Sequence, residues 1–204
     1  MGYAFALPWL LGFFIFTLYP MCSSLYYSFT NYNTLKAPKW IGLRNYIIIF
    51  TSDPLFWKSL WNTVYYAVLS VPLGIAAGVL IALLLNQKVK GMRFFRTIFY
   101  LPTVVSSVAV SLLWMWILEP NFGLLNTFLK KIGIIGPGWL TDPTWSKNSL
   151  ILMSLWTVGG GMLIYLAALQ DVPESLYEAA TIDGAGAFKK FCKITIPMIT
   201  PTLF

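Results

Sequence analysis

The sequence predicts an all-α polytopic membrane protein, as its composition and its hydropathy pattern both indicate. Of its 204 residues, 58% are hydrophobic and only 10% are charged, whereas a typical soluble domain has about 25% charged residues. Four stretches without any charged residue each exceed the roughly 20 residues that a transmembrane helix needs; they are residues 1–35, 59–87, 97–118 and 148–170. A soluble protein would have to bury all four around one another, so we expect a chain embedded in lipid.

The expected helices lie within these stretches, in a single transmembrane domain over residues 1–204. They should span about residues 4–27, 62–85, 97–118 and 149–169, with a fifth starting near residue 198. No Lys or Arg precedes Lys36, and a signal peptide needs a basic start, so we expect the first helix to be retained. Gly74 and Gly78 either let another helix approach closely or reflect the ordinary glycine content of membrane helices.

Several kinds of chemistry need residues or motifs that are scarce or absent in this sequence. There is no His, and Cys22 and Cys192 should lie on opposite sides of the membrane, so we expect neither a metal site nor a disulfide. No Gly-x-x-x-x-Gly-Lys-Ser/Thr motif occurs, so the chain should not bind ATP in that way. The four complete helices hold no Asp, Glu, Lys or Arg, which argues against a proton-driven transporter and against a membrane-embedded enzyme. We therefore expect no catalytic residue and no cofactor.

The formal net charge of +7 comes largely from loops beside the apolar runs. Basic residues in such loops orient membrane helices, so we expect no nucleic-acid partner. Residues 87–96 hold four basic residues and no acid, and the positive-inside rule places this loop in the cytoplasm. Residues 30–58 also carry four basic residues, spread over a longer stretch. Two helices separate the 87–96 loop from residues 173–197, so both segments should lie on the same side.

Residues 173–197 form a polar, helix-prone segment between apolar runs. Pro173 and Glu174 suit the first turn of a helix, and Gly184 can adopt the left-handed conformation that ends one. A second short helix should follow, with two chemically different sides: Phe188, Phe191, Cys192 and Thr195 on one, Lys189, Lys190 and Lys193 on the other. The acids of the first helix would face anionic lipid if the segment lay on the membrane surface, so a groove in another protein is favoured.

The 173–197 segment resembles the EAA loop of the permease subunits of binding-protein-dependent ABC importers. Nine positions at fixed spacing carry this resemblance: Glu178, Ala179, Ala180, Asp183, Gly184, Ala185, Phe191, Ile194 and Pro197. Other stretches resemble the carbohydrate-uptake permeases of the maltose and glycerol-3-phosphate type, namely residues 19–20, 28–30, 40–46, 91–97, 100–102 and 156–161. The resemblance implies the type I ABC importer permease fold, with four complete transmembrane helices and the start of a fifth. Members of this family usually have a basic tail before the first helix and two further helices at the end, so we expect a fragment.

The resemblance also implies partners. Cytoplasmic ABC ATPase subunits would hydrolyse ATP and dock on the coupling loop 171–197, at Glu178, Ala179, Ala180, Asp183 and Gly184. The chain would also contact a second permease subunit and an extracytoplasmic solute-binding protein. It would lie in the lipid of the bacterial cytoplasmic (inner) membrane. The chain itself would be no enzyme.

The implied cargo is a sugar or sugar-like solute of the oligosaccharide, polyol or glycerol-3-phosphate class. Candidate aromatic contacts in the substrate pathway are Trp114, Trp116, Trp156 and Tyr165. Aromatic belts at the membrane interface account for many Trp residues in such proteins, so each candidate has that second interpretation. A permease for amino acids or peptides is the nearer alternative function, and a secondary transporter is the more distant one.

We predict that residues 87–96 and 171–197 face the cytoplasm, whereas residues 30–60 and 119–148 face outward. Single-cysteine labelling of intact cells with a membrane-impermeant reagent measures this. Lys90→Cys and Lys190→Cys variants should stay unlabelled, and a cysteine in the 119–148 loop should react. Labelling of either lysine position from outside contradicts the topology.

Overall fold

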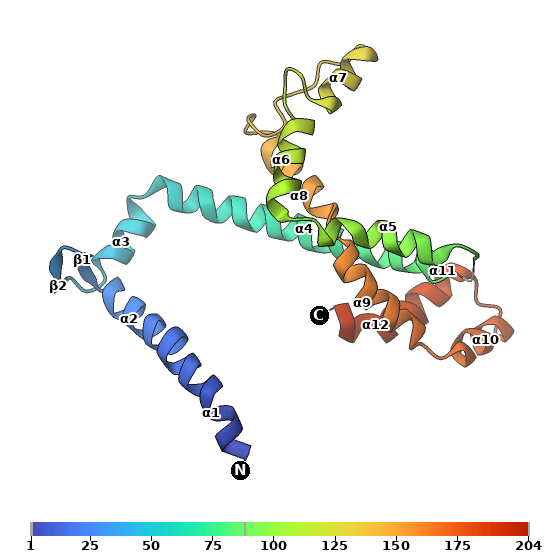
Figure 1. Cartoon of the computed structure of the whole chain (residues 1–204), viewed down its shortest axis with the longest axis horizontal. Helices are drawn as coiled ribbons and strands as arrows, with labels where there is room; N and C mark the ends of the chain where they lie inside the picture. The colour runs from blue at the N-terminus through green and yellow to red at the C-terminus, as the bar shows by residue number, and fades with distance from the viewer. Residues whose placement is uncertain (1, 88, 204) are drawn as a thin grey trace. The chain divides into compact units, whose positions relative to one another are not determined.

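The structure, a computed structural model, describes residues 2–87 and 89–203, most of which are helical (Figure 1). The chain forms two compact units, Met1–Trp61 and Asn62–Phe204. The first unit holds the N-terminal helices and a hairpin, and the second holds the remaining helices. The long helix α4 (Pro54–Leu85) contributes its first turns to one unit and the rest to the other.

The first unit begins with a continuous helical stretch that contains one wide turn. α1 (Gly2–Phe13) leads into the π-helix η1 (Phe14–Leu18) and then into α2 (Tyr19–Ser28). The Tyr19 N–H donates to the Phe14 carbonyl, five residues back, directly before Pro20. A proline has no N–H to donate, and its ring clashes with the carbonyl four residues earlier. The wide turn accommodates both effects without ending the helix.

A two-stranded antiparallel hairpin follows, so the prediction of an all-α chain is wrong for this segment. β1 (Thr30–Asn33) pairs with β2 (Lys36–Trp40). The Asn45 side-chain amide, in α3 (Arg44–Thr51), donates to the Ser28 and Thr30 carbonyls at 2.9 and 3.0 Å. Strands of four and five residues give little period-two signal, and a contact from a later helix holds them. The sequence pattern alone therefore suggested a loop.

Two described helical stretches, Phe5–Ser28 and Pro54–Leu85, are each long and apolar enough to cross a membrane. The second of these begins at Pro54, where the sequence suggested a start near residue 62. Two more stretches qualify only as bent pairs: α5 (Met92–Val104) with α6 (Ser107–Ile117), bent by 95°, and α8 (Ser146–Leu155) with α9 (Gly159–Gln170), bent by 48°. The described residues thus supply two candidate spans, or up to four if each bent pair crosses once.

The continuous helices expected over 97–118 and 149–169 are therefore both interrupted, at points where the local sequence forms helix poorly. Val105 and Ser106 adopt extended backbone conformations, with ψ of 139° and 131°. They follow Pro102 in a run of valines and serines, which lose side-chain freedom or compete for backbone hydrogen bonds in a helix. In the second pair, a turn over residues 156–158 precedes three consecutive glycines at 159–161. Glycine costs about 1 kcal/mol relative to alanine inside a helix.

The loop between α6 and α8 folds around α7 (Leu124–Lys131). The side chain of Asn126 is buried at its centre, where its amide donates to the carbonyls of Pro120 and Pro137 at 2.9 and 3.1 Å. Its oxygen accepts from the Trp139 indole N–H at 2.6 Å. One buried amide with three satisfied hydrogen bonds gives this Gly- and Pro-rich loop a defined shape.

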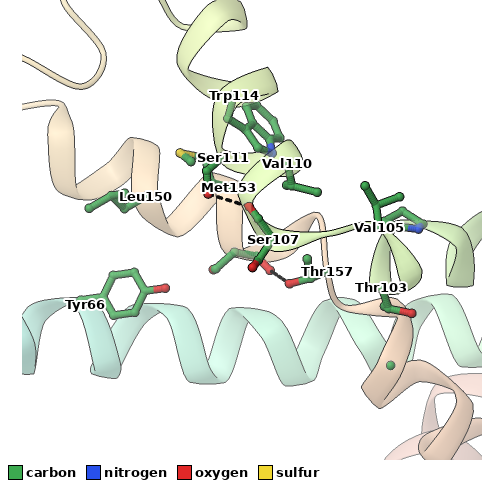
Figure 2. A pocket seen from close by; sticks show the side chains of 13 residues that line it. Tyr66, Thr103, Val105, Ser107, Val110, Ser111, Trp114, Leu150, Met153 and Thr157 are labelled. Carbon is green, nitrogen blue, oxygen red and sulfur yellow. Dashed lines mark hydrogen bonds between the residues drawn. The ribbon is translucent and has the colours of Figure 1, made fainter.

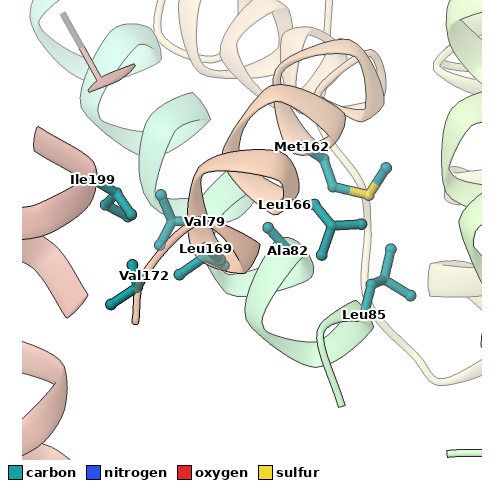
Figure 3. Close-up of a cluster of buried hydrophobic side chains, with 8 residues drawn as sticks. All are labelled: Val79, Ala82, Leu85, Met162, Leu166, Leu169, Val172 and Ile199. Atoms are coloured by element: carbon teal, nitrogen blue, oxygen red, sulfur yellow. The ribbon is translucent and has the colours of Figure 1, made fainter. Parts of the chain in front are cut away.

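The core of the second unit lies between α4, α9 and α12 (Ile196–Leu203) (Figure 3). Its buried side chains come from these helices and from the turn after α9: Val79, Ala82, Leu85, Met162, Leu166, Leu169, Val172 and Ile199. Gly78 lies against Tyr165 of α9, where an added Cβ would come within 2.8 Å of the tyrosine ring. Nothing among the described residues lies within 4 Å of such an atom at Gly74. Close helix approach therefore applies to one glycine of this pair.

The last third of the second unit contains three short helices and a second π turn. α10 (Glu174–Ile182) is followed by one helical stretch made of α11 (Ala187–Lys190), η2 (Phe191–Thr195) and α12. The helix expected to start near residue 198 thus begins at Ala187. As in the first unit, the π turn ends directly before a proline, here Pro197.

Gly159 offers a direct test of the packing between α5 and α9. A Cβ at Gly159 would overlap the carbonyl of Phe99, whereas one at Gly160 would meet only the Thr103 methyl group, at 3.9 Å. We expect Gly159→Ala to destabilise the folded protein by about 1–3 kcal/mol, the usual cost of overpacking, and Gly160→Ala to keep its stability or to raise it by up to about 1 kcal/mol, the helix preference of alanine over glycine. Thermal unfolding in detergent measures both variants. Equal stability of the two variants contradicts this packing.

Candidate functional site

A cavity of about 710 Å³ lies where both bent helix pairs are interrupted (Figure 2). Its walls come from the middle of α4, from residues on both sides of the α5–α6 break and from residues on both sides of the α8–α9 break. Irregular backbone at membrane depth is tolerated only where it is buried in protein or lines a water-filled space. The cavity provides such a place for both interruptions.

Hydroxyl groups dominate the polar chemistry of this cavity, and none of the charged side chains that the structure describes lines it. Six lining residues carry a hydroxyl: Tyr66, Thr103, Ser107, Ser111, Ser154 and Thr157. Several donate their hydrogen to their own helix: Ser111 to the Ser107 carbonyl at 2.8 Å, and Ser154 to the Ile151 carbonyl at 2.7 Å. Their lone pairs remain to accept hydrogen bonds. The walls can therefore bind a neutral, hydroxyl-bearing solute.

The four aromatic candidates from the sequence lie in different surroundings. Trp114 lines the cavity, and its ring meets that of Trp156 edge-on, with centroids 6.0 Å apart. Trp156 also lines a smaller space of about 160 Å³ beside the α5–α6 break. Trp116 is 51% exposed and is not among the lining residues, and Tyr165 packs on Gly78. The structure thus brings two of the four together.

The indole nitrogen of Trp114 lies in unusual surroundings. This atom, Nε1, is buried, yet within the described part of the chain it has no hydrogen-bond partner. A buried donor without a partner costs about 1–3 kcal/mol, and a small rotation of the Trp114 side chain toward the cavity would let this donor bond a ligand oxygen. The aromatic residue type alone gave no sign of this. The lining hydroxyls were also missed from the sequence, although Ser and Thr clustered at helix interruptions were the available signal.

The second candidate site is the coupling loop, residues 171–197. Its first helix, α10, ends in a Schellman motif: the Ala185 N–H donates to the Ala180 carbonyl at 2.8 Å, and the Gly184 N–H donates to the Thr181 carbonyl at 3.0 Å. Gly184 has a φ of +72°, so the left-handed helix end predicted from the sequence is confirmed. This conformation costs other residues about 1–2 kcal/mol.

The predicted docking residues lie on or directly after α10. Glu178, Ala179, Asp183 and Gly184 are exposed, and Ala180 is partly covered. Two large apolar side chains nearby are also exposed, Ile182 at 88% and Phe188 at 79%. Large apolar side chains that are exposed in this way mark surfaces that contact other proteins or the membrane. The sequence analysis did not single out Ile182.

The four residues predicted to share one face of the second helix do not share one environment in the structure. Phe188 and Cys192 are exposed, whereas Thr195 is buried and Phe191 packs against the core. The π turn η2 between these residues is responsible, because one extra residue rotates the following turns by about 100°. A prediction based on a regular helix could not anticipate this rotation.

Apolar helices long enough to cross a membrane, a hydroxyl-lined cavity at two helix breaks and an exposed helix-turn-helix together fit a membrane transport protein. Residues 70–204 match the family described as the inner membrane component of binding-protein-dependent transport systems. The chain belongs to this family, which comprises transport components and not enzymes. The predicted family resemblance is thereby confirmed.

Similar proteins include sugar transport permeases. The chain is 44% identical over 205 residues to a probable ABC transporter permease, YesP, of Bacillus subtilis, with 100% of this chain and 66% of that protein covered. It is 39% identical to the lactose transport permease LacF of Rhizobium radiobacter, with 99% and 68% covered. The chain thus spans about two thirds of the length of these relatives.

Solved structures give the same family. A bacterial ABC transporter involved in importing the acidic polysaccharide alginate superposes with a TM-score of 0.85 at 32% identity. The superposition covers 98% of this chain and 68% of that one. A second structure holds the alginate transporter in complex with a periplasmic protein bound to an alginate pentasaccharide, with a TM-score of 0.84 at 30% identity.

Proposed function

We propose that this chain is part of the transmembrane subunit of an ATP-driven importer that moves a sugar or sugar-like solute across the cytoplasmic membrane. The observation that carries the proposal is the family match over residues 70–204, because it contains the coupling loop and all the cavity-lining residues except Tyr66. The ATPase, the second permease subunit and the solute-binding protein would be separate chains.

The cavity supports a neutral carbohydrate as cargo. Its hydroxyls can accept or donate hydrogen bonds, and Tyr66 and Trp114 supply aromatic rings. Within residues 2–87 and 89–203, no Lys or Arg lines it, so a phosphorylated solute such as glycerol-3-phosphate would lack a counter-charge from these residues. Within the class considered, the walls favour an oligosaccharide or a polyol.

The relatives support the same cargo class. Their names assign lactose, trehalose/maltose, arabino-oligosaccharides and starch degradation products to the respective proteins. An amino-acid or peptide permease is the alternative. Uptake of radiolabelled sugars against labelled amino acids, in vesicles that contain the full-length permease and its partners, separates the two. Uptake of amino acids alone contradicts the carbohydrate proposal.

Coupling to the ATPase would occur at α10. The Schellman end of α10 fixes the direction of the exposed residues Ile182 and Asp183, and the acidic, Ala-rich surface suits a groove in a partner protein. Because α10 directly follows α9 in the chain, movement of a docked ATPase would reach the helix that lines the cavity.

We expect Gly184→Val to abolish solute-stimulated ATP hydrolysis and transport while membrane insertion stays normal. A β-branched residue at φ +72° is strained, so α10 would end differently. Gly186→Val is the matched control, because Gly186 has a φ of −68° and nothing lies within 4 Å of its would-be Cβ. ATPase and uptake assays on the assembled transporter measure both. Normal stimulation in the Gly184 variant contradicts the coupling role.

Ala180→Trp tests the same surface by bulk. The large ring should block close approach of the ATPase, so we expect co-purification of the ATPase to fall and transport to be lost. Leu176→Trp, one turn earlier on α10 at a position that is already large and 40% exposed, should be better tolerated. Equal ATPase binding by wild type and the Ala180 variant contradicts docking at this position.

Trp114→Phe should raise the KM for solute uptake about fivefold, the equivalent of one hydrogen bond of about 1 kcal/mol. The substitution removes the unpartnered indole N–H and keeps an aromatic ring against Trp156. Trp116→Phe, outside the cavity lining, is the control and should leave KM unchanged. An unchanged KM in the Trp114 variant excludes a direct hydrogen bond to the solute.

A further inference from the structure

A partly buried hydrogen bond joins the two helical parts of the coupling loop. The hydroxyls of Tyr177 in α10 and Thr195 at the end of η2 lie 2.9 Å apart, although 18 residues separate them in the chain. Thr195 is only 4% exposed, and the Tyr177 ring packs against the core cluster around Ile199. Buried polar groups need a partner, and for each of these two hydroxyls the other is that partner.

The π turn η2 is what brings Thr195 inward. The Ile196 N–H donates to the Phe191 carbonyl, five residues back, so the helix gains one residue in this turn. Phe188 before the turn and Cys192 near its start are exposed, whereas Thr195 at its end and Ile199 after it are buried. In a regular helix, residues spaced by three and four positions would share one face. The extra residue therefore places the Thr195 hydroxyl opposite Tyr177 and not toward solvent.

A second, exposed link runs between the same two parts. Lys190 Nζ donates to Thr181 Oγ1 at 2.7 Å, and Thr181 Oγ1 donates to the Tyr177 carbonyl at 2.6 Å. Exposed links of this kind compete with water and contribute little. The Tyr177–Thr195 bond is partly buried, so water competes with it less and it is the stronger of the two constraints on α10.

We infer that the hydrogen bond between Tyr177 and Thr195 holds α10 in position on the 187–203 helix and transmits displacement of α10 to the transmembrane region. Both residues act as positioning residues, away from the exposed docking surface of Ala179, Ile182 and Asp183. The inference rests on the proposed docking of the ATPase at α10. Without this bond, α10 could move with the ATPase while the 187–203 helix stays behind, and ATP would be hydrolysed without transport.

The test is the number of ATP molecules hydrolysed per solute imported, measured for the full-length permease assembled with its partners in vesicles. Tyr177→Phe and Thr195→Val each remove one hydroxyl. We expect each to raise this ratio about fivefold, the factor that corresponds to one hydrogen bond of about 1 kcal/mol. The double variant should be no worse than either single variant, because all three lack the same bond.

Two further variants separate positioning from general damage to the helix. Thr195→Ser keeps the hydroxyl and should restore the normal ratio. Thr200→Val removes a hydroxyl from the same helix that bonds only to the Ile196 carbonyl of its own turn, and it should also leave the ratio normal. A normal ratio in Tyr177→Phe and Thr195→Val, or effects of the two that multiply in the double variant, overturns the inference.

The inference can fail separately from the proposed function. If the ATPase docks at α10 but the bond is not the link, Ala180→Trp lowers ATPase binding while Tyr177→Phe keeps the normal ratio. If the docking proposal itself is wrong, Ala180→Trp leaves ATPase binding intact. Hydrogen exchange of the α10 amides gives an independent measure, since Tyr177→Phe should accelerate it about fivefold; unchanged exchange overturns the positioning role.

Discussion

The need to satisfy backbone hydrogen bonds away from water is the constraint on which the rest of this structure depends. In lipid each unsatisfied N–H or carbonyl costs several kcal/mol, so a chain with many prolines must accommodate each within or between helices. Pro20 and Pro197 do so through π turns that widen the helix by one residue. Two other helical stretches are interrupted altogether: the α5–α6 pair at residues 105–106 and the α8–α9 pair at residues 156–158. Both interruptions line the same cavity, so the constraint concentrates irregular backbone at the place where a solute could be held.

Close packing of α5, α4 and α9 follows from small residues at the same level. Gly159 lies against the Phe99 carbonyl, and Gly78 lies against the Tyr165 ring. Helices in lipid associate through van der Waals contact and not through a hydrophobic driving force, so a missing side chain at each contact matters. The glycine run at 159–161 therefore has two effects: it lets α9 approach α5, and it weakens the helix where α8 ends.

Sequence reasoning predicted the features that composition and spacing encode. Runs without charge located the apolar helices, and the glycine at 184 located the end of α10. The 30–40 hairpin, the 95° bend after Val104 and the rotation at η2 were not predicted. Each of these depends on a contact or a turn that no local pattern records: the Asn45 amide supports the hairpin, and a single added residue redirects Thr195. For the same reason the cavity hydroxyls were missed, since a serine on a helix gives no sign of the space it faces.

The position of α9 connects the two candidate sites. It begins at Gly159, beside the cavity, and ends at Gln170, three residues before Pro173 introduces α10. At 1.5 Å per residue its 12 residues span about 18 Å. The core-facing side of α9 is buried against α4 and α12 through Met162, Leu166 and Leu169. This packing favours movement of α9 together with α4 and α12 over sliding of α9 past them. The N-terminal end of α9, by contrast, adjoins the glycine-rich break. Under the proposed function, the flexible joint for transport would therefore lie at the cavity, while the rigid body that moves would comprise α9, α12, the loop between them and the C-terminal part of α4 that packs on them.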